Sequence, residues 1–210
     1  MLAELQGAQQ LETHELLNSR IESGFERSLE WLHANPSLAT LAHAGGAPAG
    51  ARGLSLYSTD TVTFLEHAAE LTEEHFGPAA IVVTYSDEAD RVRILREFAG
   101  QLTVSVFGEE ADAAVEGVRE LVRLAQEKAG RVLWNQWSTG VSVTYAQQHG
   151  GPYPATTAPA TTSVGAAAVF RFLRPVAYQG FPDSLLPDGL KEANPLGILR
   201  RVDGAVGVTS

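Results

Sequence analysis

The 210-residue sequence contains no cysteine at all. A disulfide bond, a zinc site with thiolate ligands and a cysteine nucleophile are therefore excluded for this chain. Because disulfides are rare in the reducing cytosol, a chain without cysteine fits that compartment. We expect a cytoplasmic protein.

Long apolar runs and clustered basic residues are also missing. No stretch approaches the roughly 20 apolar residues that a membrane span needs, and the start, MLAELQGAQQ, lacks the basic and apolar regions of a signal peptide. The chain has 15 Lys and Arg against 25 Asp and Glu, a net charge of -10. Since phosphate binding needs clustered cations, we expect neither a membrane span nor a nucleic-acid partner.

Motifs that hold phosphate, metal or an acyl group are missing as well. The glycine-rich stretch 44–53 has neither the G-x-G-x-x-G spacing of dinucleotide sites nor the G-x-x-x-x-G-K of P-loops, and no G-x-S-x-G is present. HELLN begins at His14 like a zinc-protease helix, but Asn18 stands where the second ligand would be. The six histidines never pair at ligand spacing, so we expect no metal site.

What the sequence does contain is an alternation of helical and extended segments. The first predicted helix ends at Asn35-Pro36. Further helices are predicted at 87–99 and, as the longest, 109–129, ending at Gly100 and Gly130. This order, with strands between the helices, favours parallel pairing and an α/β fold. The predicted strands are 54–58, 79–86, 102–107 and 131–135, and the apolar stripe of the first helix is Leu17, Ile21, Phe25, Leu29 and Leu32.

Two further local expectations concern the ends of these strands. Asp60 or Thr61 can cap a short helix after the first strand. The run 79–86 is apolar and β-branched, which is typical of a strand covered on both faces.

After Asn135 the alternation of helical and extended segments ends, and a loop rich in Gly, Pro and Thr follows over residues 138–165. A loop of this length is usually functional or lies at an interface. We then expect a helix over 165–173, a strand at RPVAYQ, 174–179, and a mostly irregular tail with one short helix. The predicted domains are 1–164 and 165–210.

Two stretches invite a functional interpretation, and each leaves an alternative open. In EEHFGP, 73–78, acids and an aromatic residue precede a Gly-Pro turn; this is either a binding segment with Glu74 and Phe76 or simply a helix end followed by a turn. The long loop carries several aromatic residues, among them Trp137, with His149 further along. Such residues line a ligand pocket or fill a domain interface.

Taken in order, several stretches resemble the C-terminal half of aldehyde dehydrogenases. More narrowly they are similar to the NADP-preferring branch that oxidises α-ketoglutarate semialdehyde (2,5-dioxopentanoate). The resemblance extends from about Leu16 to the end of the chain. The stretches are LYSTDTVTFL, LTEEHFGPAAIVV, GQLTVSVFGEE, AGRVLWNQWSTGVSV, HGGPYPATT and RPVAYQGFPDSLLP.

The resemblance implies a three-layer parallel-sheet core and specific roles for four residues. The carboxylate of Glu74 would accept hydrogen bonds from the nicotinamide ribose of NADP, and Phe76 would pack beside the nicotinamide. Trp137 and His149 would border the aldehyde tunnel. The strand at 175–179 would extend a sheet across a subunit interface, giving a homo-oligomer.

The family's catalytic groups find no counterpart in this sequence. Its cysteine nucleophile, general-base glutamate, oxyanion-hole asparagine and dinucleotide-binding domain lie upstream of the resembling stretches, so no residue is assigned a catalytic role. In addition, His75 replaces the family's usual aliphatic residue.

Three hypotheses follow from the resemblance. The chain is one half of a split enzyme completed by a separate chain that supplies the N-terminal half, or a non-catalytic interaction and dimerisation module derived from the family. The third possibility is a truncated gene product that exposes core and sheet edge.

Overall fold

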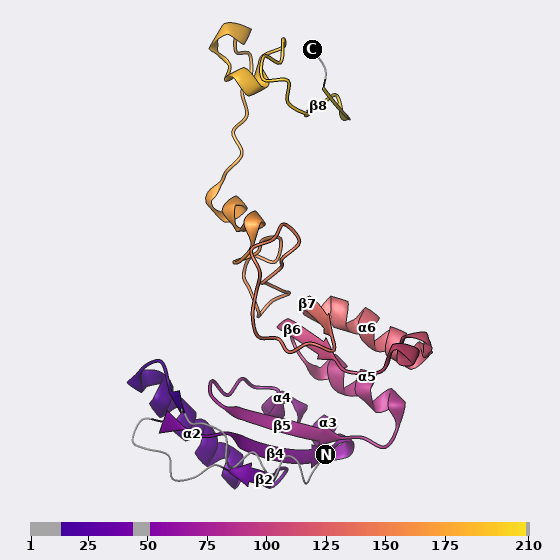
Figure 1. Cartoon of the computed structure of the whole chain (residues 1–210). Helices are drawn as coiled ribbons and strands as arrows, with labels where there is room; N and C mark the ends of the chain where they lie inside the picture. Colours follow the sequence, from indigo (N-terminus) through magenta and orange to yellow (C-terminus); the bar gives the residue numbers. More distant parts are fainter. Residues whose placement is uncertain (1–13, 44–50, 209–210) are drawn as a thin grey trace. The chain divides into compact units, whose positions relative to one another are not determined.

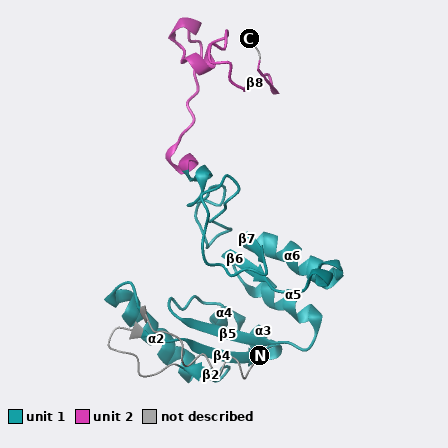
Figure 2. Cartoon of the chain, in the orientation of Figure 1, with its two compact units in different colours: residues 1–168 teal, residues 169–210 magenta. Residues whose placement is uncertain are grey.

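The computed structural model describes residues 14–43 and 51–208 (Figure 1). The chain divides into two compact units, Met1–Ala168 and Val169–Ser210 (Figure 2). The boundary expected near residue 165 concerns the extent of a catalytic domain and stays a prediction. Within the described residues, no helix combines the length and the apolar character that crossing a bilayer requires. The glycine-rich residues 44–50 lie outside the described part of the chain.

The first long helix, α2 (Ser19–Ala34), forms where the apolar stripe predicts it. Asn18 caps its start by accepting a hydrogen bond from the Ile21 amide at 3.0 Å, and Asn35 ends it before Pro36. Phe25 and Leu32 from the stripe are buried, whereas Leu17 lies outside the helix and is exposed. At 16 residues this helix, and not the one predicted over 109–129, is the longest described.

A short antiparallel ladder that the sequence analysis did not anticipate lies beside α2. It pairs β1 (His14–Glu15) with β3 (Ala51–Arg52). The Arg52 guanidinium bonds the Glu22 carboxylate at 2.8 Å and also contacts Glu26, which links β3 to α2.

The first sheet has the order β2-β4-β5, built from β2 (Ala39–His43), β4 (Ser55–Asp60) and β5 (Ala79–Thr84). The central strand β4 pairs antiparallel with β2 and parallel with β5, and it is almost fully buried. Strand β2 was not predicted. Strand β5 was expected to be covered on both faces, and this is wrong for the described residues, because none of its side chains is buried.

Two short helices connect β4 to β5. Asp60 caps α3 (Thr61–Glu66) by accepting from the Thr63 amide at 2.9 Å, which confirms the predicted cap. Helix α4 (Ala68–Leu71) follows. The apolar cluster that packs α3 and α4 against β5, α5 and α2 consists of Phe64, Ala68 and Leu71 with Trp31, Leu38, Leu65, Ile81, Val83, Ile94 and Phe98 around them.

The second sheet pairs β6 (Gln101–Val106) parallel with β7 (Ala129–Trp134). Helix α5 (Glu88–Glu97) precedes β6; the 3-10 turn η2 (Glu110–Ala114) and helix α6 (Glu116–Lys128) precede β7. The parallel α/β class is confirmed, but within the part of the chain that the structure describes β5 and β6 do not join one continuous sheet.

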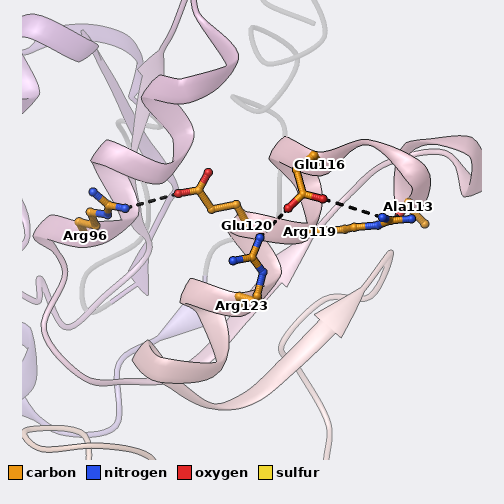
Figure 3. Close-up of polar contacts among 6 residues, drawn as sticks. All are labelled: Arg96, Ala113, Glu116, Arg119, Glu120 and Arg123. Carbon is orange, nitrogen blue, oxygen red and sulfur yellow. Dashed lines mark hydrogen bonds and ion pairs between the residues drawn. The ribbon is translucent and has the colours of Figure 1, made fainter.

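Helices α5 and α6 pack together and carry two groups of exposed ion pairs (Figure 3). Arg96 on α5 approaches Glu120 on α6 at 3.4 Å, and Glu116 contacts Arg119 and Arg123. Because these groups are largely exposed, water screens them and each pair contributes little to stability.

Two glycines have a different role from the one predicted. Helix α5 is capped by Phe98 and α6 by Ala129, so Gly100 and Gly130 are not helix caps. A Cβ at Gly100 would meet the Pro152 carbonyl oxygen at 2.2 Å, and one at Gly130 would meet the Gly150 oxygen at 2.3 Å. Glycine is required because the long loop crosses the starts of β6 and β7 at van der Waals contact.

The second unit contains short elements only. The helix expected over 165–173 is the 3-10 helix η3 (Ala166–Phe172), and η4 (Asp183–Leu185) and η5 (Asp188–Leu190) follow. A hairpin of β8 (Arg200–Val202) and β9 (Ala205–Gly207) replaces part of the expected irregular tail.

Residues 174–179 form no ladder with any described residue of this chain. The expected strand at 175–179 concerns an assembly with another subunit, so it stays a prediction.

Candidate functional site

The segment Glu73–Pro78 is held against helix α2 by two of its residues. The His75 ring stacks on Trp31 with a centroid separation of 5.4 Å. Two positions later, Gly77 lies directly over the buried Phe25 ring, and a Cβ there would come within 2.3 Å of the ring carbons. The glycine is therefore needed for contact with α2, and residues 75 and 77 both face the helix.

Glu74 and Phe76 alternate with these two residues along the segment, and their side chains are turned to solvent. Both are exposed, Phe76 to 62%. They line a shallow cleft of about 330 Å³, whose other lining residues are Leu16, Leu17, Ile21, His75 and Gly77. Among the hydrogen bonds of the described residues, none uses the Glu74 carboxylate, so both of its oxygens can accept from a ligand.

This pair has the chemistry needed to hold the ribose and ring of a nucleotide. A free carboxylate accepts hydrogen bonds from two neighbouring hydroxyls, and an exposed aromatic ring packs against a planar heterocycle. Glu74 also borders a second, larger cleft of about 760 Å³ that runs between β5 and β6. The described residues contain no group of three or more side chains suited to hold a metal ion.

The fold changes the titration of His75 in this segment. Burial lowers the pKa of His75 below its usual value, and the Glu73 carboxylate opposes the shift. The Nε2 atom is buried and has no hydrogen-bond partner among the described residues. The neutral imidazole, stacked on Trp31, is therefore the form that fits.

We predict that His75 makes the chain less stable in mild acid. When the pKa of a histidine is lower in the folded state, the unfolded chain takes up the proton first as the pH falls. The free energy of unfolding is then unaffected above about pH 6.5 and decreases below it. His75→Phe, which keeps a ring against Trp31, is expected to flatten this dependence in urea titrations between about pH 7 and pH 5.

The reference for this comparison is about pH 8, where the histidine is neutral in both states. An acid-side loss of stability as steep in His75→Phe as in the parent chain would contradict the assignment.

The structure places Trp137 and His149 away from the lining of these two clefts. Trp137 is exposed, and its ring centroid lies 5.0 Å from that of Phe107. The His149 amide donates to Thr162 Oγ1 at 2.8 Å, and its carbonyl accepts from the Ser163 amide at 3.0 Å. These contacts order the loop. The tunnel role of Trp137 and His149 stays a prediction.

Two supporting residues were missed by sequence reasoning. Trp31 stacks on His75 and positions it. It directly precedes Leu32, a buried residue of the predicted apolar stripe of α2, and this position is the signal in the sequence that points to Trp31. Asn135 adopts a positive φ of 51°, accepts from the Gly108 amide at 2.9 Å and donates to the Gly108 carbonyl at 2.7 Å. An asparagine directly after a strand is a typical left-handed residue, and here it joins the ends of β6 and β7.

Two curated proteins similar to this chain are alpha-ketoglutaric semialdehyde dehydrogenases, although no family model matches the chain. "Alpha-ketoglutaric semialdehyde dehydrogenase 2" of Azospirillum brasilense is 47% identical over 152 residues, which are 72% of this chain and 28% of that protein. "Alpha-ketoglutaric semialdehyde dehydrogenase" of Acinetobacter baylyi is 46% identical over 151 residues, with the same shares. The chain thus spans less than a third of the length of these curated relatives.

Solved structures agree on the fold. The delta-pyrroline-5-carboxylate dehydrogenase of Mycobacterium tuberculosis superposes with a TM-score of 0.57 at 13% identity, covering 82% of this chain and 32% of that one. A bifunctional proline utilization A protein gives 0.56 at 19% identity, covering 71% and 15%. By sequence, this chain is related to part of the alpha-ketoglutaric semialdehyde dehydrogenases, and its fold is similar to that of part of the solved delta-pyrroline-5-carboxylate dehydrogenase.

Proposed function

We propose that this chain works as one part of an aldehyde dehydrogenase that oxidises a semialdehyde to a carboxylate with NADP in the cytoplasm. A separate polypeptide supplies the cysteine nucleophile, the general base and the nucleotide-binding domain. The observation that carries this proposal is the outward-facing pair Glu74 and Phe76, fixed on α2 through His75 and Gly77.

Each residue of the pair has one task in this proposal. The Glu74 carboxylate accepts hydrogen bonds from the hydroxyls of the nicotinamide ribose, and the Phe76 ring packs beside the nicotinamide. The cofactor supplies the acceptor for the hydride that leaves the aldehyde carbon. Because Gly77 and His75 are anchored on buried or stacked aromatic rings of α2, the backbone that carries Glu74 and Phe76 is held in place without a ligand.

A second candidate function is that of a non-catalytic dimerisation module, and the second unit favours it. Its residues 174–179 form neither helix nor strand and have no ladder partner among the described residues, while Val176 is 56% and Tyr178 42% exposed. An exposed segment of this kind can add a strand to a sheet of another subunit.

The native mass and composition of the protein, isolated from its own source, separate the two functions. Co-purification with a chain that carries a nucleotide-binding domain and a reactive cysteine, followed by aldehyde-dependent reduction of NADP by that complex, supports the split enzyme. A homodimer without such a partner and without NADP binding supports the dimerisation module and refutes the first proposal.

Replacing Glu74 with glutamine is expected to raise the KM for NADP of the completed enzyme about 10- to 100-fold. The physical reason is the loss of charge-assisted hydrogen bonds to ribose, each of which contributes about 1.5–3 kcal/mol. Steady-state kinetics with varied NADP and saturating aldehyde measure this KM.

The matched control is Glu70→Gln, which makes the same charge change at an exposed position of α4 outside both clefts. Equal effects of the two variants would show that net charge, and not contact with the ribose, is responsible.

A further inference from the structure

Two histidines outside the candidate site meet through the fold. His33 lies in the last turn of α2 and His43 ends β2, and their ring centroids are 4.9 Å apart. Neither of them lines one of the two clefts. No metal site was expected from the sequence, because the histidines do not pair at ligand spacing. The tertiary structure forms this pair from two different elements.

The pair rests on a buried base that β4 provides. His43 is directly opposite Ser55 in the antiparallel β2–β4 ladder, so both side chains lie on the same face of the sheet. Tyr57, two residues further along β4, lies on this face too, and its ring centroid is 5.5 Å from that of His33. Ser55 and Tyr57 are each 0% exposed, whereas both histidines are exposed. The base is therefore fixed, while an ion from solvent can reach the two imidazoles.

Ser55 gives His43 the orientation of a metal ligand. His43 Nδ1 lies 2.9 Å from Ser55 Oγ. When Nδ1 carries the ring proton, it donates to this oxygen, and Nε2 keeps a lone pair for a ligand. Histidines that bind metal ions ordinarily donate their other ring N–H to a fixed acceptor, which orients the ring. An isolated surface histidine lacks such an acceptor.

The separation of the two rings fits one shared ion. Zn²⁺ binds histidine nitrogen at about 2.0–2.1 Å in tetrahedral geometry, which puts the centres of two imidazoles on one ion about 5 Å apart. The 4.9 Å between the His33 and His43 rings matches this value. Imidazole suits Zn²⁺, Cu²⁺ and Ni²⁺, whereas Ca²⁺ and Mg²⁺ need several oxygen ligands. Among the described residues, no third histidine, aspartate or glutamate completes a cluster with the pair.

The charge around the pair favours a cation. The last carbonyl groups of a helix carry a partial negative charge, which stabilises a cation nearby. His33 belongs to the last turn of α2, which ends at Ala34. The chain as a whole has a net charge of -10. A divalent cation is therefore attracted to this end of the helix.

We propose that His33 and His43 form a binding site for a divalent transition-metal ion, with Zn²⁺ as the best fit. The ion ties the end of α2 to β2, and water fills its remaining coordination positions. Because α2 also carries Phe25 and Trp31, on which the segment Glu73–Pro78 is anchored, the ion stabilises the helix that supports this segment. The site is independent of the proposed split enzyme.

The test is a titration of the full chain, without affinity-tag histidines and freed of metal, with ZnCl₂. Isothermal titration calorimetry is expected to show one Zn²⁺ per chain. His33→Gln and His43→Gln are each expected to weaken binding at least tenfold, since even the loss of an outer-shell partner costs about 10- to 100-fold in affinity. Zn²⁺ is expected to raise the midpoint of thermal unfolding of the parent chain but not of these two variants.

His67→Gln is the matched control, because it removes an exposed histidine whose side chain makes no capping hydrogen bond. Circular dichroism without metal checks that all three variants fold. Should a variant of the pair fail to fold, NMR of the parent chain decides the question. Co²⁺ is then expected to broaden the ring-proton signals of His33 and His43 before those of His67, and equal broadening of all three would overturn the inference.

Three results of the titration would also overturn the inference, and each leaves the split enzyme untouched. Absence of saturable binding below about 1 mM would make the rings, at an interplanar angle of 88°, an ordinary edge-to-face pair. Equal weakening by His67→Gln would mean that any exposed histidine binds the ion. One ion per two chains would place the ion between copies and not between α2 and β2.

Discussion

Replacing Phe25 with alanine is expected to lower the free energy of unfolding by about 3–5 kcal/mol. The ring is 1% exposed, and it lies directly beneath Gly77, so its removal leaves a cavity under the segment Glu73–Pro78. Because a domain of this size is stable by only about 5–15 kcal/mol, such a loss is a large fraction of the total. Urea unfolding, read from the midpoint at constant slope, measures the change.

Phe76→Ala is the matched control, because it removes the same side chain from the same segment at a position that is 62% exposed. Its expected effect on stability is below about 0.5 kcal/mol. Hydrogen exchange of residues 73–78 is expected to accelerate in Phe25→Ala and to stay unchanged in Phe76→Ala. Equal losses of stability would mean that the segment is not anchored on α2.

Replacing Gly130 with alanine is the second large change, with an expected loss of about 1–3 kcal/mol. A Cβ at this position would meet the carbonyl oxygen of Gly150 at 2.3 Å and its carbon at 2.6 Å. These are main-chain atoms, which cannot rotate aside as a flexible side chain can. The loop must therefore move away from the start of β7, and thermal unfolding and exchange over residues 148–162 report the movement.

Gly117→Ala provides the control with the same chemical change. Gly117 lies inside helix α6, and nothing would come within 4 Å of an added Cβ. Alanine is expected to stabilise the chain there by about 0.5–1 kcal/mol, because glycine is a poor helix former. If Gly130→Ala also stabilised the chain, the close packing of the loop on β7 would be refuted.

Local patterns in the sequence predicted much of the first unit. The spacing of Phe25 and Leu32 predicted α2, and Asp60 was identified as a helix cap. Strands β4 to β7 lie where short extended runs next to helical segments predicted them. These predictions hold because helix periodicity, caps and β-propensity act between residues close in sequence.

Other features were missed although a local signal was present. Asp203 and Gly204 both adopt positive φ, 48° and 85°, and connect β8 to β9. An Asp-Gly pair between extended residues is a strong hairpin signal, which the sequence analysis did not use. Gly100 and Gly130 were misread as helix caps because glycine after a helix has that role most often.

The sequence by itself determined the α/β class, the absence of cysteine and the resemblance of EEHFGP and its neighbouring stretches to aldehyde dehydrogenases. Only the tertiary structure decided that His75 and Gly77 face α2 while Glu74 and Phe76 face outward. The tertiary structure alone also showed that a cleft lies between β5 and β6. The physical reason is that side-chain direction and strand pairing depend on contacts between residues far apart in the chain, which local propensities do not specify.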